Sequence, residues 1–291
     1  MELVKFLFDL TAFASIMILV VSGLAVIASL MGIFNMAHGE FVLLGAYVVF
    51  LCQISGVPTW LGMVMAPFIV ALVGLVIERT VIRRLYGTPI TAMLATFAIG
   101  LTLREAVRFA IAGKYYEIAA PLPGVFSLGG VDFSIWRALI IGVTVCVMAL
   151  SIYIIRFTRF GLQIRGSLEN AALARASGLS TDRLYCWTFA IGAGLAGLAG
   201  ALMVPLFSLS ADLGLQFLVQ AFLAVMLGGV GTFEGPVFGG ALMGSLIPGV
   251  QWAREYLGIA DFISPVAGEV FIYVLILLTV KMRPQGILRR N

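Results

Sequence analysis

The sequence predicts an all-α integral membrane protein, and three observations support this fold class. Hydrophobic residues make up 62% of the 291 residues and charged residues only 11%, whereas a soluble domain has roughly 45–50% apolar and about 25% charged residues. The mean hydropathy of +1.11 is correspondingly high. The apolar residues are also gathered into runs about as long as a helix needs to cross a bilayer, about 20 residues. Secreted, cytosolic and disordered proteins are therefore excluded.

Nine apolar runs follow one another along the chain, and we expect each to form a transmembrane or re-entrant helix. They cover residues 8–31, 40–54, 60–77, 89–111, 134–155, 184–205, 216–232, 236–252 and 264–281. The runs at 216–232 and 236–252 are short and are joined by a glycine-rich stretch, which is typical of tilted, broken or re-entrant helices. We therefore expect about eight to nine such helices in a single transmembrane domain, 1–291.

Basic residues occur in three clusters that orient the chain. They are Arg79, Arg83 and Arg84, then Arg156, Arg159, Arg165, Arg175 and Arg183, and finally Lys281, Arg283, Arg289 and Arg290. The positive-inside rule places all three clusters in the cytoplasm, and an even number of runs separates each cluster from the next. Three runs precede the first cluster, so we expect the N-terminus outside and the C-terminus in the cytoplasm.

The longest polar stretch, residues 156–183, is expected to be a cytoplasmic loop with a short helix over about 168–177. Ser167 can cap this helix, Glu169 suits its positively polarised first turn, and Gly178 can adopt the left-handed conformation that ends it. One face of the helix, at spacing i, i+3, i+4 and i+7, consists of Ala171, Ala174, Arg175 and Gly178. Small side chains there allow another protein to pack closely, although an ordinary connecting loop explains the same pattern.

Polar side chains interrupt the apolar sequence between the first two runs. Asn35, His38 and Glu40 lie among glycines that allow a helix to break or to approach a neighbour closely. Polar groups at membrane depth are stable only against protein or a water-lined cavity. The segment is therefore either a gate or pathway segment or a satisfied structural network. The charge topology places it toward the cytoplasm, which favours gating over first contact with substrate.

Small residues recur at four-residue spacing in the second half of the chain and predict close helix packing. They are Gly192, Ala196 and Gly200 in one run, and Gly231, Gly235 and Gly239 further on. His38-Gly39 and Glu234-Gly235 each place a titratable residue before glycine, ahead of a helix rich in small residues. This similarity suggests two weakly related halves, which is typical of transporters with a central pathway.

Arg104, Glu105 and Arg108 lie near the outer end of the run 89–111. Glu105 and Arg108 are three residues apart and can pair on one helix face. Long side chains at a helix end can also extend to the membrane surface. We therefore expect structural pairing there rather than a functional site.

Three groups of segments carry a resemblance to a known family. The first is the stretch from Gly32 to Tyr47, which contains Asn-x-Ala-His-Gly. The second consists of residues 161–165, 169–178 and 188–200, and the third of Asp212-Leu-Gly214 with residues 222–231 and 234–236. Together they resemble the permease subunits of bacterial branched-chain amino acid ABC importers, a family that also includes urea and short-chain amide permeases.

The resemblance implies a permease subunit of an ATP-driven importer in the bacterial inner membrane, with branched-chain or other apolar amino acids as substrates. In such a subunit the loop helix would be a coupling helix that docks on an ATPase, with Glu169 and Gly178 as its markers. Asn35, His38 and Asp212, together with Glu40, would belong to the translocation pathway or gate.

The partners that the resemblance implies are a second homologous permease or an identical copy, two ATPase subunits, an external solute-binding protein and membrane lipid. ATP and Mg would bind to the ATPase subunits, because this sequence contains no P-loop motif. It also contains no catalytic constellation, and the cysteines have no metal-ligand spacing. We therefore expect no enzymatic activity, no bound cofactor or metal, and no nucleic-acid partner.

Two other functions remain open from the sequence. One is an importer permease for urea or short-chain amides, which share the Asn-x-Ala-His-Gly and Asp-Leu-Gly segments. The other is a stand-alone channel or ion-coupled carrier. That class predicts uptake without an ATPase, whereas an importer subunit should copurify with one.

Overall fold

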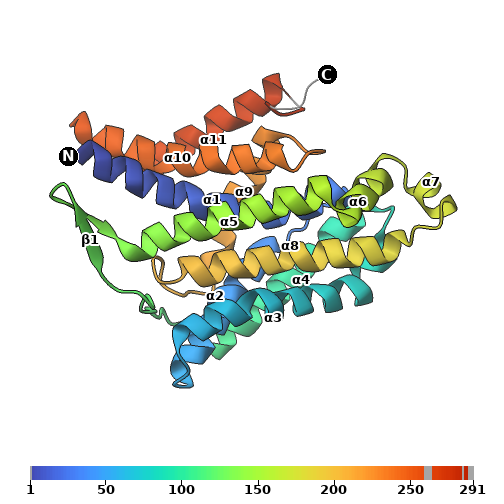
Figure 1. Cartoon of the computed structure of the whole chain (residues 1–291), viewed down its shortest axis with the longest axis horizontal. Coiled ribbons are helices and arrows are strands. Elements are labelled where there is room, and N and C mark those ends of the chain that lie inside the picture. Colours follow the sequence, from blue (N-terminus) through green and yellow to red (C-terminus); the bar gives the residue numbers. More distant parts are fainter. Residues whose placement is uncertain (1, 259–263, 284, 288–291) are drawn as a thin grey trace.

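The computed structural model describes residues 2–258, 264–283 and 285–287, which form a bundle of long helices (Figure 1). These are α1 (Glu2–Met31), α2 (His38–Ile54), α3 (Thr59–Thr80), α4 (Pro89–Ala110), α5 (Ile135–Phe157), α8 (Thr181–Met203), α9 (Leu213–Gly228), α10 (Glu234–Tyr256) and α11 (Pro265–Met282). Each predicted apolar run overlaps one of them, so the all-α prediction is confirmed. Six of the described helices are long and apolar enough to cross a membrane, while α2 and α9 are shorter. The number of full crossings stays a prediction.

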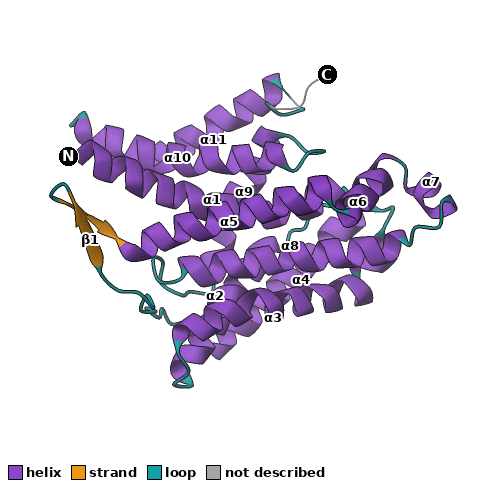
Figure 2. Ribbon diagram, in the orientation of Figure 1, coloured by secondary structure: helices purple, strands orange, loops and turns teal. Residues whose placement is uncertain are grey.

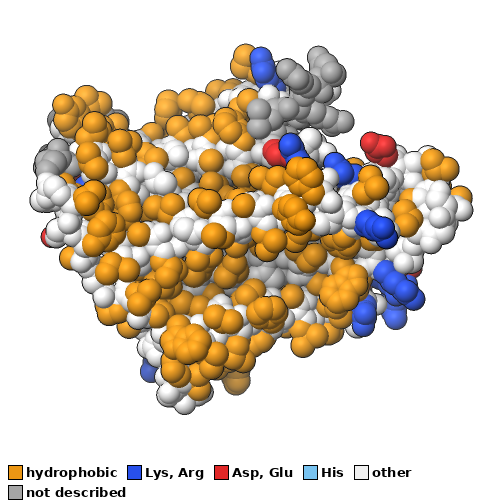
Figure 3. Space-filling view, in the orientation of Figure 1, with side chains coloured by type: hydrophobic (Ala, Val, Ile, Leu, Met, Phe, Trp, Pro, Cys, Tyr) orange, Lys and Arg blue, Asp and Glu red, His pale blue; other side chains and the backbone are white. Residues whose placement is uncertain are grey.

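Two ends of the bundle differ in character. The short helices α6 (Arg159–Glu169) and α7 (Ala171–Ala176) extend from one end, and Lys and Arg side chains gather there in the space-filling view (Figures 1 and 3). The chain begins at the opposite end, beside the end of α10 (Figure 1). A 3-10 helix, η1 (Ile82–Leu85), joins α3 to α4. Of the expected C-terminal basic cluster, Arg289 and Arg290 lie outside the described residues.

Among the helices long enough to cross a membrane, α1 and α8 are the most buried. In both, 78% of the most apolar window is buried, compared with 11% in α5 and 17% in α11. The outer helices expose large apolar side chains instead, among them Phe68 and Phe109. Such a surface is suited to the hydrocarbon region of a bilayer, which offers no hydrogen-bonding partners to side chains.

Glycines allow the central helices to approach closely. An added Cβ would collide with the backbone of α1 at Gly192, with that of α2 at Gly200, and with the C-terminal part of α9 at Gly235 and Gly239. Gly231 does not belong to this packing, contrary to the pattern expected from its spacing. It lies in the turn before α10 with φ +110°, and no atom of the described residues lies within 4 Å of an added Cβ. Its role is to make that turn.

The helix contacts repeat within the chain. α3 packs on α8 as α10 packs on α1, and α2 packs on α3 and α4 as α9 packs on α10 and α11. The units α1–α4 and α8–α11 run in opposite directions, since α1 and α8 are antiparallel in Figure 1. This packing agrees with two related halves, but it changes which segment of the second half corresponds to His38-Gly39. The counterpart of His38-Gly39 is Leu213-Gly214, at the start of α9, and not Glu234-Gly235.

The connection between α4 and α5 contains a β-hairpin that the helical reading of the sequence missed (Figure 2). Strands β1 (Val125–Leu128) and β2 (Val131–Ser134) are antiparallel. The turn between them is Gly129-Gly130, both with positive φ, as two-residue hairpin turns require. A Gly-Gly pair between short runs of alternating apolar residues was the available signal.

Candidate functional site

The candidate site begins where the chain turns back after α1. Gly32 has φ +68°, and the following residues to Ala37 are not helical and are largely buried. The Asn35 side chain, fully buried, accepts a hydrogen bond from the Ala37 amide at 3.0 Å. The Met36 amide donates to Thr96 Oγ1 of α4, also at 3.0 Å. Side chains thus replace the helical hydrogen bonds that this segment lacks.

His38 joins the start of α2 to the middle of α1. Its Nε2 lies 2.8 Å from the Val20 carbonyl oxygen, and since a carbonyl oxygen can only accept, Nε2 carries the hydrogen. The ring occupies space beside Gly23, where an added Cβ would lie 2.9 Å from Cε1. The imidazole is fully buried, and Nδ1 has no partner within the described part of the chain. α2 therefore begins inside the bundle, opposite the middle of α1.

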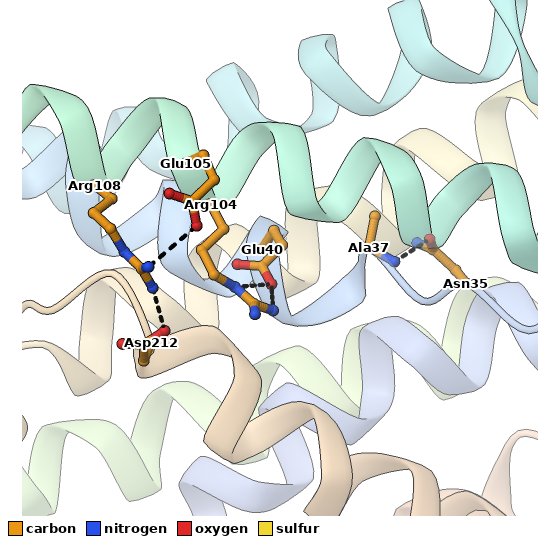
Figure 4. A network of polar contacts seen from close by, with 7 residues as sticks. All are labelled: Asn35, Ala37, Glu40, Arg104, Glu105, Arg108 and Asp212. Carbon is orange, nitrogen blue, oxygen red and sulfur yellow. Dashed lines mark hydrogen bonds and ion pairs between the residues drawn. The ribbon is translucent and has the colours of Figure 1, made fainter.

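Glu40 forms a buried ion pair with Arg104 of α4 (Figure 4). Arg104 Nε donates to Glu40 Oε1 at 3.0 Å, and Nη2 contacts the same oxygen. The Arg104 side chain is 12% exposed and the Glu40 side chain 1%. Glu40 Oε2 is buried and without a partner among the residues described. Sequence reasoning singled out both residues but did not pair them, because 64 residues separate them.

A second, more exposed set of ion pairs continues from this one. Arg108 contacts Glu105 at 3.2 Å and Asp212 at 2.7 Å (Figure 4). The first contact is the expected pair on one face of α4. The second links α4 to Asp212, the residue just before α9, across 104 residues of sequence. The structural pairing predicted for α4 is therefore part of a network that includes Glu40 and Asp212.

The starts of α2 and α9 touch within the bundle. A Cβ added to Gly39 would collide with the Gly214 carbonyl, and one added to Gly214 with the Gly39 carbonyl. Two helix N-termini, each with a partial positive charge, thus meet where Glu40 and Asp212 supply carboxylates. We call this contact and its ion pairs the α2/α9 junction.

The loop after α5 contains two helices where one was expected over 168–177. α6 continues to Glu169, and α7 begins after Asn170, whose side chain accepts a hydrogen bond from the Leu173 amide at 2.9 Å. Asn170 is therefore the cap, whereas Ser167 is buried in α6 and donates to the Ile164 carbonyl oxygen. Asn and Ser are equally good caps, so the residue types alone did not distinguish the two positions.

The face expected to meet a partner also differs. Ala174 is 6% exposed, and Arg175 Nε donates to Thr181 Oγ1 at 2.8 Å, so both contact their own chain. Gly178 has φ +84°, as a left-handed helix end requires. The large apolar side chain that α7 presents is Leu173, 64% exposed, which the sequence pattern did not single out.

One ion pair and one partly buried hydrogen bond stabilise the end of the bundle near α6 and α7. Arg83 pairs with Asp182 at 2.7 Å, and this carboxylate raises the pKa of the guanidinium. The Tyr86 hydroxyl donates to the buried Glu78 carboxylate. Burial, and then this hydrogen bond, raises the pKa of Tyr86 well above its usual range.

Comparisons with known proteins bear on the whole chain. Residues 6–280 match the family model described as branched-chain amino acid transport system / permease component. The chain is 30% identical over 290 residues to the high-affinity branched-chain amino acid transport system permease protein BraD of Pseudomonas aeruginosa, covering 94% of this chain and 91% of BraD. It is 28% identical over 289 residues to the high-affinity branched-chain amino acid transport system permease protein LivH of Escherichia coli K12. That match covers 94% of this chain and 91% of LivH.

One solved structure is similar in fold. A chain of PsaBC from Streptococcus pneumoniae, determined in complex with Fab, superposes with a TM-score of 0.52. The sequence identity is 14%, and the match covers 96% of this chain and 92% of that one. The similarity at this identity concerns the fold alone.

Proposed function

The chain belongs to the family of branched-chain amino acid transport permeases, and from this premise we propose that it is the permease subunit of an ATP-driven importer in the bacterial inner membrane. Its substrates are branched-chain or other apolar amino acids. The observation that carries the proposal is the family match over residues 6–280. The relatives named above give no support to the urea or amide alternative, or to a channel or carrier.

The subunit crosses the membrane with the end that contains α6 and α7 in the cytoplasm. The gathering of basic side chains at that end supports this orientation (Figure 3), which leaves the N-terminus outside. Its partners are a second permease, homologous or identical, two ATPase subunits that bind ATP and Mg, and an external solute-binding protein.

The α2/α9 junction is the gate. α2 is anchored to α1 through His38, so α9 is the element that moves. The Arg108 to Asp212 contact joins α9 to α4 and is partly exposed, and it is therefore easier to break than the buried Glu40 to Arg104 pair. Rotation of α9 away from α2 would separate the glycine contact and admit a solute.

The loop 156–183 transmits the motion of the ATPases. α7 projects from the bundle (Figure 1) and exposes Leu173 as an apolar contact. Arg156 at the end of α5 pairs with Glu234 at the start of α10, with the shorter contact at 2.7 Å. Displacement of α7 and α6 would thus reach α10, which packs on α9.

Reconstitution tests the function directly. The chain is coexpressed with its partner permease and ATPases, and leucine and urea uptake into proteoliposomes is measured with the external binding protein present. We expect leucine accumulation that requires ATP and the ATPases. Equal uptake without the ATPases, or transport of urea but not of leucine, would refute the proposal.

Two substitutions in the same loop test the coupling role. Gly178→Ala forces a side chain into the left-handed conformation, at a cost of about 1 kcal/mol, and should lower ATP-dependent uptake, as should Glu169→Gln. Gly166→Ala is the control, since its added Cβ meets none of the described residues within 4 Å and Ala favours a helix. Unchanged uptake in both test variants would remove the loop from the mechanism while leaving the transport function intact.

A further inference from the structure

A cavity of about 510 Å³ lies at the end of the bundle opposite α6 and α7. The first half of α1, the last turns of α10, and residues of α5, α9 and α11 surround it. Its volume is within the range of small-molecule sites, about 300–1,000 Å³. In the orientation proposed above, the cavity lies in the outer half of the subunit, where an external binding protein would release its solute.

Aromatic rings that contact one another form much of the wall. Phe6 stacks on Trp252 with ring centroids 4.6 Å apart. Phe207, in the connection before α9, meets Phe217 edge to face at 5.2 Å and Phe13 at 6.2 Å. Rings held by such contacts provide an apolar surface whose shape is set before a ligand enters.

The cavity also contains charges of both signs. Asp9 pairs with Arg137, and each side chain is more than a third exposed. Glu255 and Glu269 also line the cavity. Among the described residues around it, carboxylates thus outnumber guanidinium groups, so the cavity favours a ligand with an ammonium group and offers Arg137 to an anion.

Gln220 is a buried polar residue in the wall of this cavity. The residue is 3% exposed and lines the cavity from α9. Its Nε2 donates to the Tyr273 hydroxyl at 3.3 Å, whereas its Oε1 finds no donor in the described part of the chain. A buried amide oxygen without a donor is unfavourable, and an N–H group of a ligand would satisfy it.

We propose that this cavity binds a free amino acid with an apolar side chain, and this inference rests on the function proposed above. The carboxylate pairs with Arg137, because a guanidinium recognises planar anions through two donors. The ammonium lies among the carboxylates and donates to Gln220 Oε1. The apolar side chain lies against the aromatic rings. A zwitterion leaves water readily only where both its charges find partners, and this cavity supplies both.

The position of the cavity connects it to the gate. Gln216, Phe217 and Gln220 belong to the first two turns of α9, the helix whose Gly214 touches Gly39 at the α2/α9 junction. A ligand bound to these side chains would contact the element that moves when the gate opens.

Binding to the full-length chain in nanodiscs tests the proposal. The lipids are phosphatidylglycerol and phosphatidylcholine, which carry no primary amine, and the signal is Trp fluorescence. The ligands are leucine, 3-methylbutylamine, which lacks the carboxylate, and 4-methylpentanoate, which lacks the ammonium group. We expect leucine to bind at least about tenfold more tightly than either analogue, and Trp252→Phe to remove the signal.

Two variants assign the recognition groups. Arg137→Gln should reduce leucine binding to the level of 3-methylbutylamine while leaving the amine's own binding unchanged, a difference that general misfolding cannot produce. Gln220→Leu should weaken leucine and the amine together, by about tenfold. Arg83→Gln is the matched control, because its ion pair with Asp182 is exposed and lies at the end of the bundle near α6 and α7, and it should leave all three affinities unchanged.

Several outcomes would overturn the proposal. Equal affinity for leucine and its analogues, or unchanged leucine binding in Arg137→Gln, would show that the cavity does not recognise the carboxylate and the ammonium group of an amino acid together. Loss of leucine binding when phosphatidylethanolamine is added would identify a lipid headgroup as the occupant. If reconstituted importer containing Arg137→Gln still accumulates leucine at the full rate, the cavity fails as a substrate site and the proposed function stands. If no variant, nor the unmodified complex, transports leucine, the function itself fails.

Discussion

Replacing Arg104 by Met should destabilise the bundle by about 3–5 kcal/mol, because the Glu40 carboxylate then stays buried without its counter-charge. Glu40 is 1% exposed, and of its two carboxylate oxygens only Oε1 has a partner among the described residues, namely Arg104. Met retains an unbranched stem in place of the arginine stem, so the change removes charge and hydrogen bonds more than packing.

Thermal unfolding of the purified chain in nanodiscs measures this effect. A loss of 1 kcal/mol lowers the melting temperature by roughly 2–4 °C for chains of 150–250 residues, so a loss of about 3–5 kcal/mol predicts a decrease of about 6–20 °C. The double variant Glu40→Met/Arg104→Met buries no charge and should recover most of the loss, since apolar residues of similar volume replace buried ion pairs at little cost.

The control is Arg156→Met, which breaks an ion pair whose side chains are 57% and 43% exposed. Exposed pairs contribute about 0–1 kcal/mol, so this variant should melt within about 4 °C of the unmodified chain. Equal melting of the Arg104→Met and Arg156→Met variants, or a double variant as unstable as Arg104→Met alone, would refute the account of Glu40 as a buried charge that requires Arg104.

Three further predictions concern packing and helix ends. Gly200→Ala should cost about 1–3 kcal/mol in stability, because its Cβ would collide with the backbone of α2. Gly142→Ala should not destabilise, because its added Cβ has no neighbour within 4 Å in the described part of the chain. Tyr86→Phe should cost about 1–3 kcal/mol, since it removes the hydroxyl that donates to the buried Glu78. Asn170→Ala should weaken α7 by about 1 kcal/mol and lower ATP-dependent uptake, measured in proteoliposomes.

Matched controls make these predictions specific. Tyr185→Phe removes the hydroxyl of the ring that packs edge to face on Tyr86, and it should melt close to the unmodified chain. Ser167→Ala should leave uptake unchanged, because Ser167 donates within α6 rather than capping α7. An uptake defect in Ser167→Ala but not in Asn170→Ala would restore the single helix first expected from the sequence.

The positions of the long helices could be predicted from the sequence because insertion into the membrane depends on the hydrophobicity of each segment. In lipid, the backbone N–H and C=O groups of an apolar run must form hydrogen bonds within the protein. A helix satisfies them within the segment itself, without contacts to another segment. The run 216–232 ended too late by this criterion alone, since α9 stops at Gly228 and Gly229 has φ +91°. The clustering of Lys and Arg in the segments expected on the cytoplasmic side was also visible in the sequence, because it depends on where these residues occur along the chain and not on tertiary contacts.

What lies inside the bundle was decided by tertiary structure. Small residues at four-residue spacing permit a close approach but do not name the helix that approaches, so Gly214, and not Gly235, proved to be the counterpart of Gly39.

By itself, then, the sequence determined an all-α membrane protein, its helical segments and its resemblance to a permease family. Only the tertiary structure brought Glu40 to Arg104, and placed Gln220, charged groups and aromatic rings from separate helices around one cavity. The physical reason is that partners of buried polar groups are chosen by helix packing over long sequence separations, whereas membrane burial is a local property of each segment.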